Sequence, residues 1–470
     1  MITRRTLLSA PAAFQAVRAA DVRRFHAGAA TANISPHLGC SLAGNMTDHL
    51  ARDLHDELHV RALVLDNGQA RLALATVDSC AVPRSIFDAA KQLIQQHTGI
   101  PASHVLLSAT HSHSCPAATH LFQSLPDPQY TAFLTARIAD AVRLAVQRLE
   151  PAQIGWGIGR EPSQLFNRRY HMKPGTELKT PLGGVDKVRT NPGYANPNIV
   201  KPAGPIDPDL GILAVHAANG RPVAVLGSYA LHYVGGTGAD TISADYFPVW
   251  GDTLLREAGL PLHATVTMMT NACSGNINNV DVTAKPQSYP PFGKIQQVSA
   301  ILAAESLRVW KNVKFESWVD LKAAIREIEL GVRLPSTAEA AAARKIVGDN
   351  PPNSFRKAED IYARETVFLA RDYQPSTKVI VQALRLGGLG IGTFPGEAFC
   401  ELGLEVKKKS PTSATMIIEL ANGYHGYIPT EEAHAEGGYE TWRAKSSFLA
   451  ADAAPKMVAG VVANLQSIGS

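Results

Sequence analysis

The chain lacks the features that mark nucleic-acid-binding, membrane-spanning and cysteine-rich proteins. Its charge is nearly balanced, with 45 Lys and Arg against 41 Asp and Glu, and no basic tract with interleaved aromatics argues for nucleic acid. No apolar run approaches the roughly 20 residues of a transmembrane helix. The five cysteines lie far apart without a CxxC pair, which excludes a cysteine-type zinc site, and their odd number leaves at least one unpaired. What remains, in 470 residues with 45% hydrophobic and 18% charged side chains, is a folded globular protein.

The N-terminus carries a paired arginine, Arg4-Arg5, followed by a short, weakly apolar run that ends near Ala19. This pattern resembles a twin-arginine export signal, and we expect residues 1–20 to be a signal peptide of an exported, periplasmic protein. The alternative interpretation is a frayed N-terminal helix.

Strand-like apolar runs alternate with helical patterns along the chain, which predicts an α/β architecture of layered, mixed β-sheets flanked by helices. The predicted strands are 59–65, 73–77, 105–108, 211–216, 222–226, 266–269, 379–386 and 415–420, and the predicted helices are 84–96, 130–149, 247–258, 294–309 and 398–409.

Two segments depart from this alternation. Residues 167–208 are rich in Pro, Gly and Asn and have little periodicity, so we expect a long ordered loop that walls a pocket. Residues 334–373 contain a helical pattern broken at Asn350-Pro351-Pro352, which predicts an inserted helical pair. No linker divides the chain, and we expect one domain over residues 21–470.

Four polar clusters follow apolar runs, and side chains at the ends of strands can converge on one cavity. The first contains His111-Ser112-His113, directly after a predicted strand. The other three contain His232, Glu397 and Tyr427. Two imidazoles, a carboxylate and a phenol form a plausible ligand set for zinc.

The order of these motifs along the chain resembles the neutral (non-lysosomal) ceramidase family. The resemblance covers nearly all of the chain after the N-terminal segment. It rests on Ala32-Asn33-Ile34-Ser35-Pro36, His55-Asp56, Arg61-Ala62-Leu63, His111-Ser112-His113, Asn167-Arg168, Gly204-Pro205-Ile206-Asp207-Pro208, Pro395-Gly396-Glu397 and Tyr424-x-x-Tyr427-Ile428.

The resemblance implies the fold of the family's catalytic domain and an amidase centre with one zinc ion. Its ligands would be His111, His232, Glu397 and Tyr427. His113 would lie beside the metal and contact the substrate carbonyl or relay a proton, and Arg168 would face the bound substrate.

Each of these roles has a simpler alternative. His232 could be a hydrogen-bonded core histidine. Glu397 follows a Pro-Gly turn and could be a carboxylate at a helix N-terminus. Tyr427 could be a packing residue, and His425 competes with it as a ligand.

The stretch from Asn271 to Asn279 departs from the family, which has a serine in a Gly-Asp-x-Ser-Pro-Asn element. Alignment on Gly275 places Asn278 at the serine position, while Ser274 is out of register. An amide is no nucleophile, although it can donate a hydrogen bond to an oxyanion. This argues for direct attack by metal-activated water. We also expect the family's additional C-terminal β-domain to be missing, which leaves ceramide open as a substrate.

The sequence therefore predicts a zinc-dependent hydrolase that cleaves an amide (N-acyl) bond in a small-molecule or lipid-like substrate. An ester or lactone substrate is the alternative on the same centre. Two other classes remain: a metal-free hydrolase that uses Ser274, Cys273 or Cys115, and a non-catalytic exported binding protein.

Overall fold

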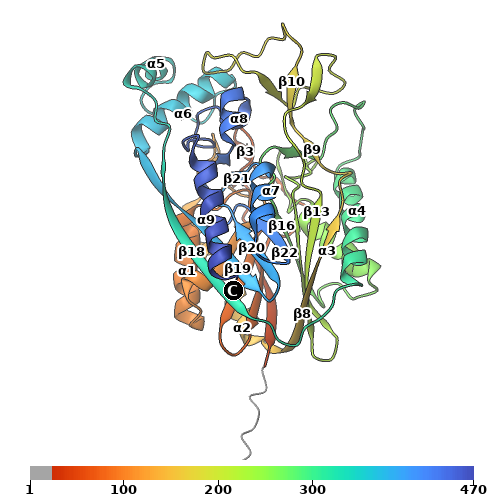
Figure 1. The fold of residues 1–470 in the computed structure, drawn as a ribbon. Coiled ribbons are helices and arrows are strands. Elements are labelled where there is room, and N and C mark those ends of the chain that lie inside the picture. The colour runs from red at the N-terminus through yellow and green to blue at the C-terminus, as the bar shows by residue number, and fades with distance from the viewer. Residues whose placement is uncertain (1–23, 470) are drawn as a thin grey trace, which may run out of the picture.

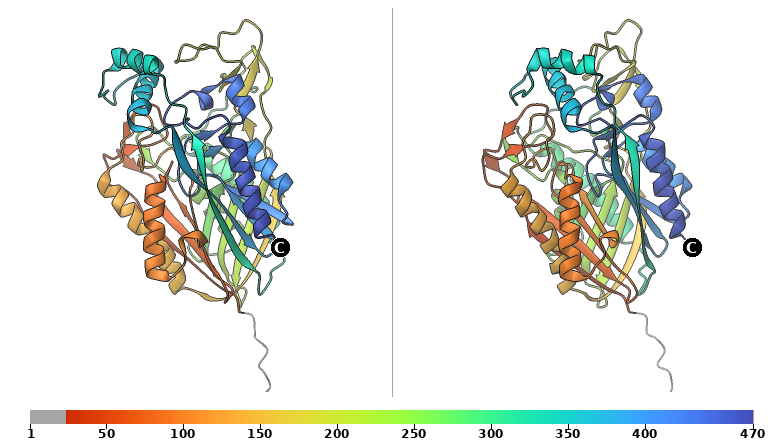
Figure 2. Two further views of the ribbon diagram at one scale, coloured as in Figure 1. Left: turned by 60° about the vertical axis from the view of Figure 1, so that its left-hand side comes forward. Right: turned by 90° about the vertical axis from the view of Figure 1, so that its left-hand side faces the viewer.

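The computed structural model describes residues 24–469, which form two β-sheets packed face to face with helices on both outer sides (Figure 1 and Figure 2). The predicted signal peptide lies outside the described residues. The first sheet has the strand order β16-β14-β13-β8-β1-β5-β6-β7 and the second has the order β18-β19-β20-β22. This arrangement confirms the predicted α/β class with layered mixed sheets.

The strands of the first sheet are β1 (His26–Asn33), β5 (His59–Asp66), β6 (Arg71–Val77), β7 (Val105–Ala109), β8 (Glu150–Arg160), β13 (Asp209–Ala217), β14 (Pro222–Tyr229) and β16 (Val266–Asn271). Those of the second sheet are β18 (Leu321–Gly331), β19 (Ser376–Leu386), β20 (Leu389–Thr393) and β22 (Ala414–Ile418). The helices are α1 (Arg84–Thr98), α2 (Pro128–Gln147), α3 (Tyr246–Glu257), α4 (Gly293–Trp310), α5 (Thr337–Val347), α6 (Ala358–Asp372), α7 (Cys400–Lys409), α8 (Glu431–Glu436) and α9 (Ala453–Ser467).

The first sheet is buried on both faces, and strand β5 shows how its side chains alternate between two cores. Leu63 and Leu65 point into the core between the sheets. Val60, Ala62 and Val64 point the other way, into the core beneath α1 and α2. Because successive side chains of a strand face opposite sides, one strand supplies both layers.

Outer helices cover the rest of the two sheets. Helices α3 and α4 pack on β8, β13 and β14, and helices α7 and α9 pack on the second sheet. In the view that is turned by 90°, the layers follow one another as helices, sheet, sheet and helices (Figure 2).

The segment 167–208 is not the continuous loop that the sequence predicts. It contains a small antiparallel sheet in the order β11-β10-β12, built from β10 (Arg169–Met172), β11 (Val188–Thr190) and β12 (Ile199–Pro202). Strands of three or four residues among Pro, Gly and Asn are too short to produce a detectable period of two. Helix α7 also differs from its prediction. It begins at Cys400, two residues later than predicted, because Glu397 and Ala398 form the short strand β21 (Glu397–Ala398).

Helices α5 and α6 lie on either side of the Asn350-Pro351-Pro352 break. Helix α5 begins with a capping box, in which the Ser336 hydroxyl accepts from the Glu339 N–H and the Glu339 carboxylate accepts from the Ser336 N–H.

All five cysteines are buried and free. Within residues 24–469, no helix is both long and apolar enough to cross a membrane.

The connectivity brings several strand ends to one place. Strand β7 pairs in parallel with β6, β14 with β16, and β20 with β22. Parallel neighbours end at the same edge of a sheet, so the residues that follow them emerge side by side.

Candidate metal centre

The structure brings together the predicted ligands His111, His232 and Glu397. His111 follows β7, His232 follows β14, and Glu397 follows β20 at the start of β21. All three side chains are buried, with exposed fractions of 1–2%. One nitrogen or oxygen atom from each lies within 4.8 Å of the others, which makes the group a candidate metal site.

The separations between the facing atoms suit a tetrahedral ion. Nε2 of His111 lies 3.1 Å from Nε2 of His232 and 3.3 Å from Oε2 of Glu397, and Nε2 of His232 lies 3.6 Å from the same oxygen. Two ligand atoms at about 2.0–2.1 Å from one zinc ion, at the tetrahedral angle, would be about 3.3 Å apart. The residues present therefore fit a zinc ion without rearrangement.

Backbone carbonyls hold both imidazoles in the orientation that a metal requires. Nδ1 of His111 lies 2.7 Å from the Cys80 carbonyl oxygen, and Nδ1 of His232 lies 3.2 Å from that of Ser274. A carbonyl only accepts, so each Nδ1 carries the proton and each Nε2 turns its lone pair to the centre. His111 adopts a φ of +68°, in the left-handed region that non-glycine residues rarely occupy.

Glu397 carries an oxygen atom that the protein leaves without a hydrogen bond. Its Oε1 accepts from the Tyr424 hydroxyl at 2.7 Å, whereas Oε2 is buried and has no hydrogen-bond partner within residues 24–469. Burial raises the pKa of Glu397, but His111 and the hydroxyls of Tyr427 and Tyr424 together lower it, and the net shift is downward. A buried, ionised oxygen that faces two imidazole nitrogens is suited to a cation.

Of the three imidazoles in the cluster, only that of His111 is favoured in the charged form. Burial lowers the pKa of His111, but Glu397 and Cys80 together raise it, and the net pKa lies well above its ordinary value. Burial and the neighbouring His111 hold the pKa values of His113 and His232 well below theirs. The cluster therefore favours a single positive charge beside Glu397, the position a metal ion would take.

His113 lies at the edge of this cluster. Its Nε2 is 3.1 Å from Nε2 of His111, and its ring stacks on Tyr233 with the centroids 3.7 Å apart. Gly44, which sequence reasoning missed, packs on the same ring: a Cβ built there would lie 2.5 Å from Cγ of His113. Half-buried and neutral, His113 is placed to contact a molecule entering the centre.

Tyr427 lies beside Glu397, because β21 pairs in parallel with β23 (Tyr427–Ile428) and places the two residues opposite each other. Both line a narrow cavity of about 20 Å³ together with His111, His113 and Tyr424. His425, the competing ligand, turns elsewhere: its Nδ1 lies 3.1 Å from the Pro395 carbonyl oxygen. Tyr424 belongs to the Tyr424-x-x-Tyr427 motif, but the sequence indicated no role for it. Its hydroxyl donates to Glu397.

Arg168 approaches the centre from the segment 167–208. Its guanidinium carbon lies 5.3 Å from the centroid of the Tyr427 ring, and it donates to Glu440 at 2.8 Å and to the Gly275 carbonyl at 2.7 Å. Glu440 also accepts from Arg169 at 3.2 Å and from Thr190 at 2.7 Å. This buried carboxylate, which no sequence motif indicated, fixes the arginine and ties the segment to the C-terminal part of the chain.

Within residues 271–279, the stretch that departs from the family, Asn278 and Ser274 lie in different surroundings. Asn278 lies on β17 (Ile277–Asn278) and donates to Asn191 at 3.0 Å; no contact of the described chain joins it to the imidazoles. Ser274 is buried behind His232, 3.4 Å from its Nδ1, and donates to Glu419. The sequence analysis did not name Glu419 either. A single acidic residue in the apolar run 417–420 could have indicated a buried, functional carboxylate.

Of the comparisons with known proteins, only the one with solved structures finds a likeness. No protein-family model matches the chain, and neither does any curated protein. Among solved structures, the chain is similar to the neutral ceramidase from Pseudomonas aeruginosa, with a TM-score of 0.72 and 15% identity, over 96% of this chain and 75% of that one. A ceramidase complexed with C2 matches at a TM-score of 0.70 and 15% identity, over 95% and 75% of the two chains.

These likenesses define a class: an α/β protein with the fold of the neutral ceramidases. At this identity they show the fold alone, and in that sense the predicted resemblance is confirmed.

Proposed function

We propose that the chain is a zinc-dependent hydrolase that cleaves an amide (N-acyl) bond. The observation that carries this proposal is the unpartnered Oε2 of Glu397, buried and facing the Nε2 atoms of His111 and His232. Tyr427, which lines the same cavity, is the proposed fourth ligand.

A zinc ion held there would supply Lewis acidity, which lowers the pKa of a water molecule towards about 7 and polarises a carbonyl group. The chain's own residues orient the reaction. His111 and His232 keep their Nε2 lone pairs on the centre through the Cys80 and Ser274 carbonyls. His113, neutral because of its lowered pKa, accepts a proton or donates to the substrate carbonyl.

Arg168 is the proposed partner of the negative charge that develops on the carbonyl oxygen. Its position does not depend on substrate, because Glu440 and Gly275 already hold it beside Tyr427. Asn278 stays a proposed second donor, and one of its two amide N–H groups donates to Asn191.

The structural neighbours are ceramidases, which supports an N-acyl substrate, small or lipid-like. An ester or lactone remains the second candidate, since the same centre activates either carbonyl. Burial opposes the metal-free alternative. Cys115 and Cys273 are fully buried, and burial raises both pKa values well above the ordinary value, which disfavours the nucleophilic thiolate. Ser274 is enclosed behind His232.

Elemental analysis of the purified protein, combined with variants, tests the proposal. We expect one zinc per chain, lost together with turnover of an N-acyl substrate panel in His111→Ala and His232→Ala. His113→Ala should retain zinc and lose about 100-fold or more in kcat, the range for a general acid or base. His97→Ala, on the exposed side of α1, is the control and should match the wild type.

Turnover that survives complete removal of zinc by a chelator would overturn the mechanism. Zinc binding without turnover of any amide, ester or lactone in the panel would favour the binding-protein alternative.

We also propose export through the Arg4-Arg5 segment. Sequencing the N-terminus of the protein recovered from the periplasm should show cleavage near residue 20, and Arg4→Lys with Arg5→Lys should keep the protein inside the cell.

A further inference from the structure

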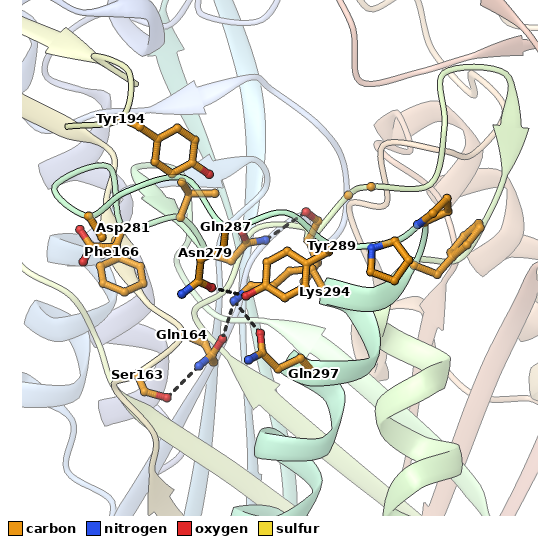
Figure 3. Close-up of a pocket in the computed structure, with 18 of the residues that line it drawn as sticks. Ser163, Gln164, Phe166, Tyr194, Asn279, Asp281, Gln287, Tyr289, Lys294 and Gln297 are labelled. Carbon is orange, nitrogen blue, oxygen red and sulfur yellow. Dashed lines mark hydrogen bonds between the residues drawn. The ribbon is translucent and has the colours of Figure 1, made fainter. Parts of the chain in front are cut away.

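A second and much larger cavity, of about 700 Å³, borders the chain segment that follows His232. Val234, Gly235 and Gly236 line it, and so do Lys294 and Gln297 at the start of α4 (Figure 3). Its volume lies in the range of small-molecule sites, about 300–1,000 Å³. None of the predicted zinc ligands lines it.

The polar part of this lining includes three charged side chains, Asp281, Lys285 and Lys294, and four carboxamides: Gln164, Asn279, Gln287 and Gln297. Each carboxamide offers an acceptor and two donors in one plane. Gln287 and Gln297 accept a hydrogen bond from Tyr289 and Lys294 respectively, and in the described part of the chain their amide nitrogens donate to no protein group. These groups suit adjacent hydroxyls of a ligand.

The apolar part of the lining contains aromatic rings beside aliphatic side chains and prolines. Phe166, Tyr194 and Tyr289 border the cavity, and Tyr194 is 44% exposed. An aromatic face carries partial negative charge and attracts the slightly positive C–H groups on the face of a sugar ring. A cavity lined by both aromatic side chains and carboxamides is therefore suited to bind a sugar, whose ring carries several hydroxyl groups.

Lys294 supplies a positive charge without a carboxylate partner. Its ammonium lies 3.1 Å from the Gln297 side-chain oxygen and 3.4 Å from that of Gln164, and 5.3 Å from the centroid of the Tyr289 ring (Figure 3). No ion pair of the described residues includes it. Amide oxygens orient the ammonium but leave its charge uncompensated, so an incoming carboxylate would gain a charge-assisted hydrogen bond.

We propose that this cavity binds a sugar acid, with its ring against the aromatic side chains, its hydroxyls on the carboxamides and its carboxylate on Lys294. The binding site is separate from the candidate metal centre and does not require the proposed hydrolase activity. One chain segment lies between them: Tyr233 stacks on His113, while Asn279 donates to the Tyr233 and Val234 carbonyls at 3.0 and 3.1 Å. An occupant would contact this segment on the side of the cavity.

Isothermal titration calorimetry of the full chain with digalacturonate, and with maltose as a neutral disaccharide, tests the proposal without any measurement of turnover. We expect digalacturonate to bind and maltose to bind at least about tenfold more weakly, since only the acid gains the charged hydrogen bond. Lys294→Gln should weaken digalacturonate binding about tenfold or more and leave maltose unchanged. Lys311→Gln, at the exposed other end of α4, is the matched control and should bind as the wild type does.

Tyr289→Ala provides a second variant, which should weaken both sugars because the ring face is shared. Circular dichroism of each variant shows whether it is folded. The proposal is overturned if digalacturonate does not bind at millimolar concentration, if maltose binds equally well, or if folded Lys294→Gln binds digalacturonate as tightly as the wild type.

Discussion

The carboxylate of Glu419 accepts two hydrogen bonds from Ser274, one from its backbone N–H at 3.0 Å and one from its hydroxyl. Its other oxygen accepts from the N–H of Ala398 at 2.7 Å. Ser274 supports His232, and Ala398 directly follows Glu397, so one fully buried carboxylate positions two of the candidate ligands.

The Glu419→Gln variant tests this role. A carboxamide has only one oxygen, so either Ser274 or Ala398 loses its acceptor. We expect the free energy of unfolding in urea to fall by about 1–3 kcal/mol, and zinc affinity in chelator competition to fall about 10–100-fold. Glu405→Gln, an exposed partner of Lys409, should change neither. Wild-type zinc affinity in Glu419→Gln would show that the carboxylate does not position the ligands.

Gly44 allows His113 to lie where it does. Gly44→Ala would place a methyl group 2.5 Å from the His113 ring, at a φ of +111° that is already unfavourable for alanine. We expect kcat to fall at least about tenfold as the ring is displaced, with one zinc per chain retained. Gly39→Ala is the matched control, since its φ is +88° but its Cβ would meet nothing within 4 Å. Equal losses of kcat in the two variants would assign the effect to backbone strain alone.

Glu440 lies between two buried arginines, and its pKa is lowered: burial raises it, but Arg168 and Arg169 outweigh that effect. Glu440→Gln would leave Arg168 without a carboxylate partner and Arg169 with only Glu436, whose oxygen lies 3.6 Å away. We expect the free energy of unfolding to fall by about 3–5 kcal/mol, the cost of breaking a buried ion pair. Urea denaturation measures it, with the exposed Glu432→Gln as the control. A loss below 1 kcal/mol would mean that solvent reaches the arginines.

His425 makes stability depend on pH. Burial lowers its pKa to about 4, although the Pro395 carbonyl opposes the shift. In the unfolded chain the pKa is about 6.5. Between these values the unfolded state binds more protons, so stability is complete above pH 6.5 and falls as the pH drops towards 4.

Urea unfolding at pH 7.5 and 5.0 measures this contribution. We expect the wild type to lose about 2 kcal/mol more than His425→Gln over that interval, since each pKa unit corresponds to about 1.4 kcal/mol. Parallel losses in the two proteins would show that His425 is not the group responsible.

Much of the architecture was predictable because its elements carry strong local patterns. Strand β7 and helix α1, for example, lie within one or two residues of the predicted ranges. Strands β1, β8 and β18 were missed: β1 is largely alanine, while β8 and β18 mix polar, glycine and apolar residues without a clean alternation. The buried residues of β1 and β8 owe their burial to the facing sheet and helices, which no local window contains.

The sequence by itself determined which donor types are available and that each of them follows an apolar run. It could not determine that they meet, because 286 residues separate His111 from Glu397 along the chain. Parallel pairing of β6 with β7, β14 with β16, and β20 with β22 decided that, since it brings the strand ends to neighbouring edges. Tertiary structure alone also placed Glu419 against Ser274 and Ala398, Gly44 against His113, and Asn278 against Asn191. Contacts between distant segments leave no local pattern in the sequence.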